Sequence, residues 1–392
     1  MKRRGVEMSI VKTGLSLIND NIDLFRGKKI GLLTNATAVD DNLRTILDVF
    51  SSNAFNTVRV FGPEHGFWGA APDGERVSSS YDHRYGVEVV SLYGEKERPD
   101  KEELEDLDII VYDIQDVGLR FYTYLYSLAY MMEECGKLGI QVVVLDRPNP
   151  LGDRIEGPII EPDYNSFVGG YSIPVRYGLT IGELAQYFNK AFDMGVDLRV
   201  IEMKGYRKEM YYDQTGLHWS TPSPNLPALE HTILFSGFCM LEGVNVSVGR
   251  GTVHPFKYVG APWIEPGRLL KALKSFRHEG VAFRERAFVP SLSKYKGELC
   301  QGVEAYVTDR EKIKPLNIAI DLVHLIYTMF TKDFEWDTAY HEAGGRHHFD
   351  LITGNGSVRR AIESGEDSKT VLPAYEQDTR KFEERAKEFR IY

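Results

Sequence analysis

A carboxylate, an imidazole and two aromatic rings lie side by side in residues 61–69, Phe-Gly-Pro-Glu-His-Gly-Phe-Trp-Gly. This stretch follows an apolar run at 57–60 that is typical of a buried strand. Its glycines let the backbone turn sharply and approach a ligand closely, and Pro63 stiffens the turn. A rigid loop that presents Glu64 and His65 beside Phe67 and Trp68 has what a sugar-cleaving site needs. The alternative is a tight turn whose Glu64 only accepts a hydrogen bond from a neighbouring backbone N–H group.

A parallel sheet is the element that must position this loop. Apolar runs rich in Val and Ile occur at 29–35, 57–61, 87–92, 107–113 and 140–146, and a further strand is expected at 198–203. Helical patterns at 43–50 and 122–138 lie between them, and Gly139 is placed to end the second helix. This alternation of strands and helices predicts an α/β fold with a Rossmann-like parallel sheet.

Polar side chains follow four of these predicted strands. Asn35 stands at the end of the first run, and Glu64 and His65 follow the second. Asp113, Gln115, Asp116 and Arg120 stand at or just after the end of the run 107–113, and Asp146, Arg147 and Asn149 stand at or just after the end of the run 140–146. Ligands of open parallel sheets bind beyond the carboxyl ends of the strands, so we expect a shared polar crevice there. The alternative is that some of these groups cap helices, Asp116 among them.

The second half of the chain is less regular. We expect residues 1–200 to form the Rossmann-like domain and residues 201–392 to form a smaller mixed α+β domain that completes a cleft. Two of its loops carry polar groups. The loop at 219–227 is stiffened by prolines and contains Asn225. The loop at 241–252 contains several glycines together with Glu242, Asn245 and Arg250. An arginine between glycines can reach an anion, although an exposed turn is the alternative. Helices at 316–330 and 376–392 are expected to be scaffold, as is Glu183, which pairs with Thr180 in a capping box.

Composition narrows the function classes. The 392 residues are 43% apolar, which suffices for a large core, and the net charge of −10 comes without a basic block, which argues against a nucleic-acid ligand. No GxGxxG or P-loop motif indicates a nucleotide cofactor, and we expect no cofactor. The three cysteines form no CxxC pair, and Cys135 is expected in the core. The sequence contains no signal peptide or membrane-spanning run, so a cytoplasmic location is expected.

Several long motifs together resemble one family. They lie at 31–35, 61–69, 112–118, 120–124, 145–150, 222–225, 242–245 and 249–252. The chain resembles the exo-acting β-N-acetylmuramidases from about Gly14 to Tyr392. The resemblance implies a cleft between two domains and release of N-acetylmuramic acid from the non-reducing end of peptidoglycan fragments, with Glu64 as the proposed catalytic residue. Many members are exported, which leaves an exported location possible, and the family often has a glutamate where this chain has Val248, so no catalytic role passes to that position.

Glycoside hydrolysis needs an acid at the leaving oxygen and a second group opposite the anomeric carbon. We expect Glu64 to be the acid, with a pKa raised by Phe67 and Trp68. Asp113, Asp116 and Glu242 are candidates for the second carboxylate, unless the amide of the sugar takes that role. The lactyl acid of N-acetylmuramic acid calls for an arginine, for which Arg120, Arg147 and Arg250 are the choices.

The remaining expected substrate contacts are predicted from the same loops. They are Asn35, His65, Trp68, Asp113, Gln115, Tyr122, Asp146, Asn149, Asn225 and Asn245. Two other functions stay open at this point: a metal-dependent hydrolase built on Asp113, Asp116, Asp146 and a histidine, and a sugar-binding module without activity. No HxH or HExxH spacing supports a metal site, and we expect none.

Overall fold

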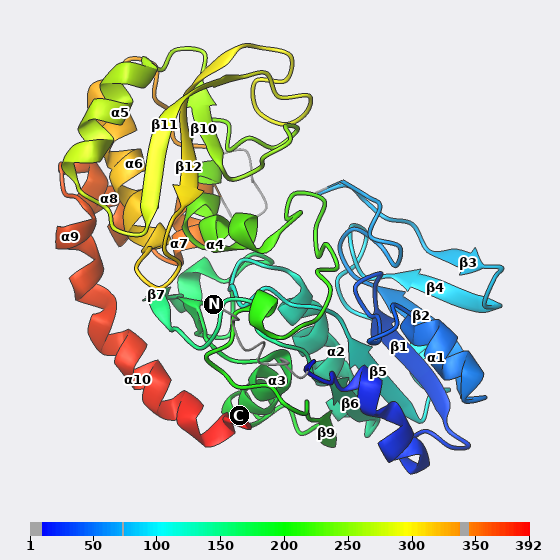
Figure 1. Cartoon of the computed structure of the whole chain (residues 1–392). Coiled ribbons are helices and arrows are strands. Elements are labelled where there is room, and N and C mark those ends of the chain that lie inside the picture. The colour runs from blue at the N-terminus through cyan, green and yellow to red at the C-terminus, as the bar shows by residue number, and fades with distance from the viewer. Residues whose placement is uncertain (1–9, 73, 338–344) are drawn as a thin grey trace, which may run out of the picture.

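The computed structural model describes residues 10–72, 74–337 and 345–392 and contains a seven-stranded sheet (Figure 1). In spatial order the strands are β3 (Ser80–Asp82), β4 (Val87–Ser91), β2 (Asn56–Gly62), β1 (Lys29–Thr34), β5 (Ile109–Asp113), β6 (Gln141–Leu145) and β9 (Leu198–Ile201). All neighbours run parallel except the edge pair of β3 and β4. The Rossmann-like α/β prediction is confirmed, and each strand expected from its apolar run is present.

Helices cover both faces of this sheet because its central strands are apolar on both sides. Leu32 packs on the face covered by α1 (Ile46–Ser52) and the 3-10 helix Leu15–Leu24. Its neighbour Leu33 packs on the other face, which α2 (Tyr124–Leu138) and α3 (Ile181–Ala191) cover. Successive side chains of a strand point to opposite faces, so a continuous apolar run requires two such layers.

Local sequence signals set the ends of these helices. Gly139 follows α2 in the left-handed conformation with φ of 69°, as its position after the helical pattern predicts. Thr180 and Glu183 form the expected capping box at the start of α3: each side chain accepts a hydrogen bond from the backbone N–H of the other. Cys135 is fully buried in α2, which confirms its expected place in the core.

The second half builds a smaller α+β layer, as predicted. Its antiparallel sheet has the order β10 (Tyr258–Ala261), β12 (Cys300–Val307), β11 (Val281–Phe288). Its helices are α4 (Leu229–Phe238), α5 (Pro266–Ser275), α6 (Pro315–Met329), α7 (His348–Thr353), α8 (Ser357–Glu363) and α9 (Ser368–Val371). None of these three strands was predicted from the sequence, because β10 has only four residues and neither β11 nor β12 carries a long apolar run.

The chain then returns to the large sheet. In Figure 1, α10 (Glu376–Ala386) leads from α9 back toward α3, and its residues contact β7 (Glu156–Ile159), which pairs with β8 (Pro174–Arg176). The last strand of the large sheet ends at Ile201, next to the predicted boundary at 200. The apolar cluster on the α2 face continues into α4 and α6, so one core spans both halves, and the division into two domains stays a prediction. In the described residues, no helix is both long and apolar enough to cross a membrane.

Candidate active site

A cavity of about 700 Å³ lies where the loops of the large sheet meet the smaller α+β layer. The lining residues from the first half lie in the loop after β2, in the turn before α2 and at 165–168. Those from the second half lie at 223–226, in α4, and at 239–256 and 346–352. Five residues named from the sequence line it: Glu64, His65, Tyr122, Glu242 and Arg250. Its size is in the range of ~300–1,000 Å³ that is usual for small-molecule sites.

Glu64 is half-buried in the cavity wall, and both of its carboxyl oxygens are held. Oε1 accepts a hydrogen bond from the backbone N–H of Gly74 at 3.2 Å, and Oε2 accepts one from the hydroxyl of Thr123 at 2.7 Å. The turn behind it is closed by a hydrogen bond from the Gly66 N–H to the Pro63 carbonyl at 2.9 Å. Thr123 occupies the N-cap position of α2, yet its side chain makes no cap hydrogen bond and donates to Glu64 instead.

His65 is buried directly beside the acid and holds the loop. Its Nδ1 lies 2.8 Å from the carbonyl oxygen of Ala71, and its backbone has a positive φ of 68°. A positive φ is unfavourable for a residue with a side chain, so the surrounding loop must hold this conformation. The imidazole therefore fixes the path of the chain from 65 to 71 as well as lining the cavity.

Glu242 and Arg250 form an ion pair in the wall of the cavity. Nε of Arg250 lies 2.5 Å from Oε1 of Glu242 and its second terminal nitrogen lies 3.1 Å from Oε2, a bidentate arrangement. Burial acts to raise the pKa of Glu242, but the charge and hydrogen bonds of Arg250 outweigh it and hold the pKa below its ordinary value. Arg250 also packs over the ring of Phe256 at 5.0 Å.

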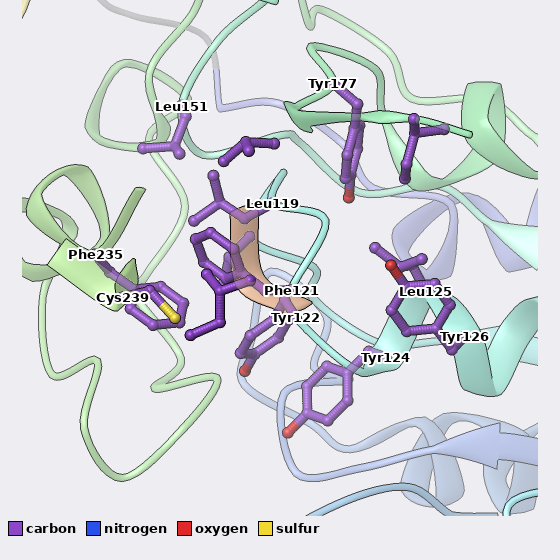
Figure 2. Packing of buried hydrophobic residues seen from close by; sticks show 14 of the residues in the cluster. Leu119, Phe121, Tyr122, Tyr124, Leu125, Tyr126, Leu151, Tyr177, Phe235 and Cys239 are labelled. Atoms are coloured by element: carbon purple, nitrogen blue, oxygen red, sulfur yellow. The ribbon is translucent and has the colours of Figure 1, made fainter. Parts of the chain in front are cut away.

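Aromatic rings form much of the remaining wall. Figure 2 shows Phe121 and Tyr122 in the turn before α2, with Phe235 and Cys239 beside them. Phe121 and Phe235 meet edge to face with ring centroids 5.0 Å apart, and the Tyr122 hydroxyl donates to the carbonyl of Pro222 at 2.7 Å. All four residues line the cavity, so an apolar surface faces its polar groups.

Two further hollows border the loop that carries Glu64. A second cavity of about 660 Å³ shares Glu242, Arg250 and His348 with the first and takes in Asn225. Trp68 does not line the cavity of Glu64: with Phe67 it lines a separate hollow of about 330 Å³. The rings that the sequence analysis expected to surround Glu64 thus lie elsewhere, and Phe121, Tyr122, Phe167 and Phe235 take their place.

The other polar groups at the strand ends are buried against one another. Arg147 forms a bidentate pair with Asp113 and also donates to the carbonyl of Val39 at 3.1 Å. Burial raises the pKa of Asp113 even though Arg147 opposes the shift. Neither residue lines the 700 Å³ cavity, so the structure does not bring this pair to Glu64.

Asp116 and Asp146 are also enclosed. Oδ2 of Asp116 accepts hydrogen bonds from the Gly118 N–H at 2.7 Å and from the Tyr177 hydroxyl, and burial raises its pKa to about 6. Asp146 accepts from four donors, the backbone N–H groups of Arg147 and Gly182 and the hydroxyls of Thr180 and Tyr392. Burial raises its pKa to about 7. Both carboxyl groups lie outside the cavity lining.

Three amide side chains of this edge bond to nearby backbone. Asn35 accepts from the Thr37 N–H at 3.0 Å, and Gln115 donates to the Pro148 carbonyl at 2.7 Å. Asn149 donates to the Leu179 carbonyl at 2.9 Å. In the second half, Asn245 likewise joins 333–335, donating to the Asp333 carbonyl at 2.7 Å and accepting from the Glu335 N–H at 2.9 Å. None of the four lines the cavity.

Arg120 is fully buried and joins three segments of the chain. Its guanidinium donates to the carbonyls of Pro158 at 2.6 Å, Ile173 at 3.0 Å and Ile352 at 2.8 Å. Burial lowers its pKa to about 10. Ile352 belongs to the cavity wall, so Arg120 supports that wall from behind without lining it.

Sequence comparison decides the family. The N-terminal model of the exo-β-N-acetylmuramidase NamZ matches residues 30–230, and the C-terminal model matches residues 233–392. This chain belongs to the NamZ family. A peptidoglycan β-N-acetylmuramidase NamZ of Bacillus subtilis strain 168 is 43% identical over 385 residues, which are 97% of this chain and 91% of the relative.

Two solved structures from Bacteroides fragilis have the NamZ-like fold of this chain. Both are described as DUF1343 family proteins. One has a TM-score of 0.89 at 32% identity and covers 97% of this chain and 99% of its own. The other has a TM-score of 0.76 at 29% identity and covers 98% and 99%. The fold predicted from the resemblance is therefore confirmed.

Several side chains that line the cavity of this NamZ family member were not predicted from the sequence, among them Thr123, Arg346 and His348. Thr123 lay inside a quoted motif but was taken as part of a helix. Arg346 is exposed and packs its guanidinium over the ring of Tyr164 at 5.4 Å. The only signal for Arg346 and His348 was the basic run 346–348, which is far from Glu64 in sequence. In residues 10–72, 74–337 and 345–392, no three His, Cys, Asp or Glu side chains come together as metal ligands would.

Proposed function

We propose that this chain is an exo-acting glycosidase that releases N-acetylmuramic acid from the non-reducing ends of peptidoglycan-derived glycans. Membership of the NamZ family and the 43% identical peptidoglycan β-N-acetylmuramidase of Bacillus subtilis support this reaction. The observation that carries the assignment to this chain is the Glu64 carboxyl group in the wall of a cavity lined by aromatic rings. Peptidoglycan fragments are the proposed substrates, and a cytoplasmic location stays a prediction.

Glu64 is the proposed general acid. The backbone N–H of Gly74 can only donate, so Oε1 of Glu64 must remain an acceptor. The Thr123 hydroxyl can donate or accept, so Oε2 keeps its partner whether or not it carries a proton. Oε2 is therefore the oxygen suited to carry the proton to the leaving glycosidic oxygen and to recover one afterwards.

Glu242 is the proposed second carboxylate. Its bidentate pair with Arg250 and its lowered pKa favour the ionised form, which suits an anion that stabilises positive charge at the anomeric carbon. In this role it can also accept a hydrogen bond from the acetamido N–H of the sugar. Asp113 and Asp116, the other candidates, lie outside the cavity lining.

Recognition of the lactyl acid is assigned to cations in the cavity wall. Of the three arginines considered from sequence, Arg250 lines the cavity, whereas Arg120 and Arg147 are buried and do not line it. Arg250 already binds Glu242, and Arg76 and Arg346 add two further guanidinium groups to the same wall. We propose that Arg346 pairs with the lactyl carboxylate of the substrate, because planar guanidinium groups bind carboxylates well.

The direct test uses two glycans that carry a label at the reducing end and differ only in the sugar at the other end. Mass spectrometry of digests should show free N-acetylmuramic acid and a chain shortened by one sugar when N-acetylmuramic acid is terminal. A chain that ends in N-acetylglucosamine should remain whole. Internal cleavage, or equal cleavage of both glycans, contradicts exo-acting muramidase activity. Loss of the reaction in chelator would favour a metal-dependent hydrolase instead.

A further inference from the structure

Two strongly exposed aromatic side chains lie on the far side of the Glu64 loop. Trp68 is 49% exposed and Tyr81 is 54% exposed, and both line the hollow of about 330 Å³. Elsewhere in the described residues, Phe192 is the aromatic side chain nearest to them in exposure, at 38%, and it lies at the end of α3, packed against Tyr171. Exposed apolar groups that gather in one concave place indicate a binding surface more often than isolated ones do.

Neighbouring side chains hold both rings in place without covering them. Phe67 is buried behind Trp68, with ring centroids 4.7 Å apart, and Tyr81 packs edge to face on His83 at 5.2 Å. Tyr81 belongs to β3, which pairs with β4 at the edge of the large sheet (Figure 1). Rings that are already ordered lose little conformational entropy when a ligand stacks on them.

The rest of the hollow fits a neutral, hydroxylated ligand. The hydroxyl groups of Ser78 and Ser80 lie on its rim with the two rings. His65 and Asp82 are its lining residues that can be charged near neutral pH, and Oδ1 of Asp82 accepts from the N–H groups of Arg84 and Tyr85. A saccharide can stack its apolar C–H face on the two rings and form hydrogen bonds with the serine hydroxyl groups of the rim. The lining residues that the structure describes include no cluster of cations that would bind an anion.

The hollow adjoins the catalytic cavity. His65 lines the hollow and the 700 Å³ cavity, and Ala70 lines the hollow and the 660 Å³ cavity. Only the loop formed by residues 62–71 therefore separates the hollow from these two cavities. We propose that the Trp68–Tyr81 hollow is an accessory site that binds a sugar ring of a peptidoglycan strand outside the catalytic cavity. The proposal rests on the proposed function for the identity of the polymer, 2-acetamido sugars in β linkage.

The test separates polymer binding from catalysis. Wild type, Tyr81→Ala and the matched control Phe192→Ala are assayed for retention on insoluble peptidoglycan and for hydrolysis of a small chromogenic muramide. Tyr81→Ala should weaken retention by about 5-fold, the effect expected of one lost stacking contact, while muramide hydrolysis and the melting temperature stay at the wild-type values. Phe192→Ala should match wild type in retention and in muramide hydrolysis, and soluble β-linked N-acetylglucosamine oligomers should compete with retention of the wild type.

Other outcomes overturn the accessory site. These are equal retention of wild type and Tyr81→Ala, equal losses in Phe192→Ala, or a parallel loss of muramide hydrolysis in Tyr81→Ala. Sedimentation that shows a wild-type dimer broken by Tyr81→Ala would assign the rings to a second copy of the chain and also overturn it. If wild type fails to hydrolyse the muramide but Tyr81→Ala still loses retention, the proposed function fails and the glycan site stands.

Discussion

The hydroxyl of Thr123 donates a 2.7 Å hydrogen bond to Oε2 of Glu64, although the two residues are 59 positions apart. The contact joins the start of α2 to the loop after β2, so the orientation of the acid depends on the segments that follow two strands of the sheet, β2 and β5. Because a hydroxyl can donate or accept, the same contact can serve both protonation states of Glu64.

Replacement of Thr123 by valine keeps the shape of the side chain and removes this hydrogen bond. We expect kcat for a chromogenic muramide to fall by about 10-fold, because hydrogen bonds to charged groups contribute about 1.5–3 kcal/mol. KM should change little. Thr123→Ser retains the hydroxyl and should keep most of the activity. Wild-type kcat in a well-folded Thr123→Val protein would show that this contact does not position the acid.

Arg346→Gln tests recognition of the lactyl acid. The variant should raise KM for muramides by about 10-fold, because a charge-assisted hydrogen bond is lost. For substrate analogues without the acid group, wild type and variant should bind alike. Arg380→Gln, on the exposed face of α10, is the matched control and should behave as wild type. An equal effect of Arg346→Gln on both substrate classes would remove Arg346 from this role.

Asp146 should make stability depend on pH. Burial raises its pKa in the folded protein to about 7, from an ordinary value of 3.8. The folded state therefore binds the proton more tightly, and this contribution to stability is complete below pH 3.8 and is lost as the pH rises through 7. Urea unfolding from pH 4 to 8 should show wild type losing stability relative to Asp146→Asn.

The exposed Asp20→Asn variant is the control for this measurement and should follow wild type across the range. Asp116 is present in all three proteins, so its own titration cancels in the comparison. A constant difference between wild type and Asp146→Asn from pH 4 to 8 would contradict a raised pKa at Asp146.

The fold was predictable from the sequence because its signals are local. The helix expected at 122–138 is α2, Tyr124–Leu138, and the one expected at 316–330 is α6, Pro315–Met329. Buried parallel strands leave continuous apolar runs, and caps such as Thr180 leave a three-residue spacing. The strands β10, β11 and β12 carry neither signal and were missed.

The candidate site was harder to predict because burial of polar groups depends on distant partners. Asp113 and Asp146 follow their strands as ligand-binding residues would, but Arg147 pairs with the first and Tyr392 reaches the second from 246 positions away. Arg120 is covered in the same way by the carbonyl of Ile352. Sequence spacing identifies which polar groups stand at the edge of the sheet. Which of them line the cavity depends on contacts with segments that are distant in the sequence, such as those of Ile352 and Tyr392.

The central claim is that Glu64 supplies the proton for glycosidic cleavage. The most direct measurement is kcat/KM of Glu64→Gln for release of N-acetylmuramic acid from a chromogenic muramide, with Glu75→Gln on the neighbouring exposed loop as the control. The account predicts a loss of about 10²–10⁴-fold for Glu64→Gln with an unchanged melting temperature, and near-normal activity for Glu75→Gln. Turnover by folded Glu64→Gln within a few fold of wild type would contradict it.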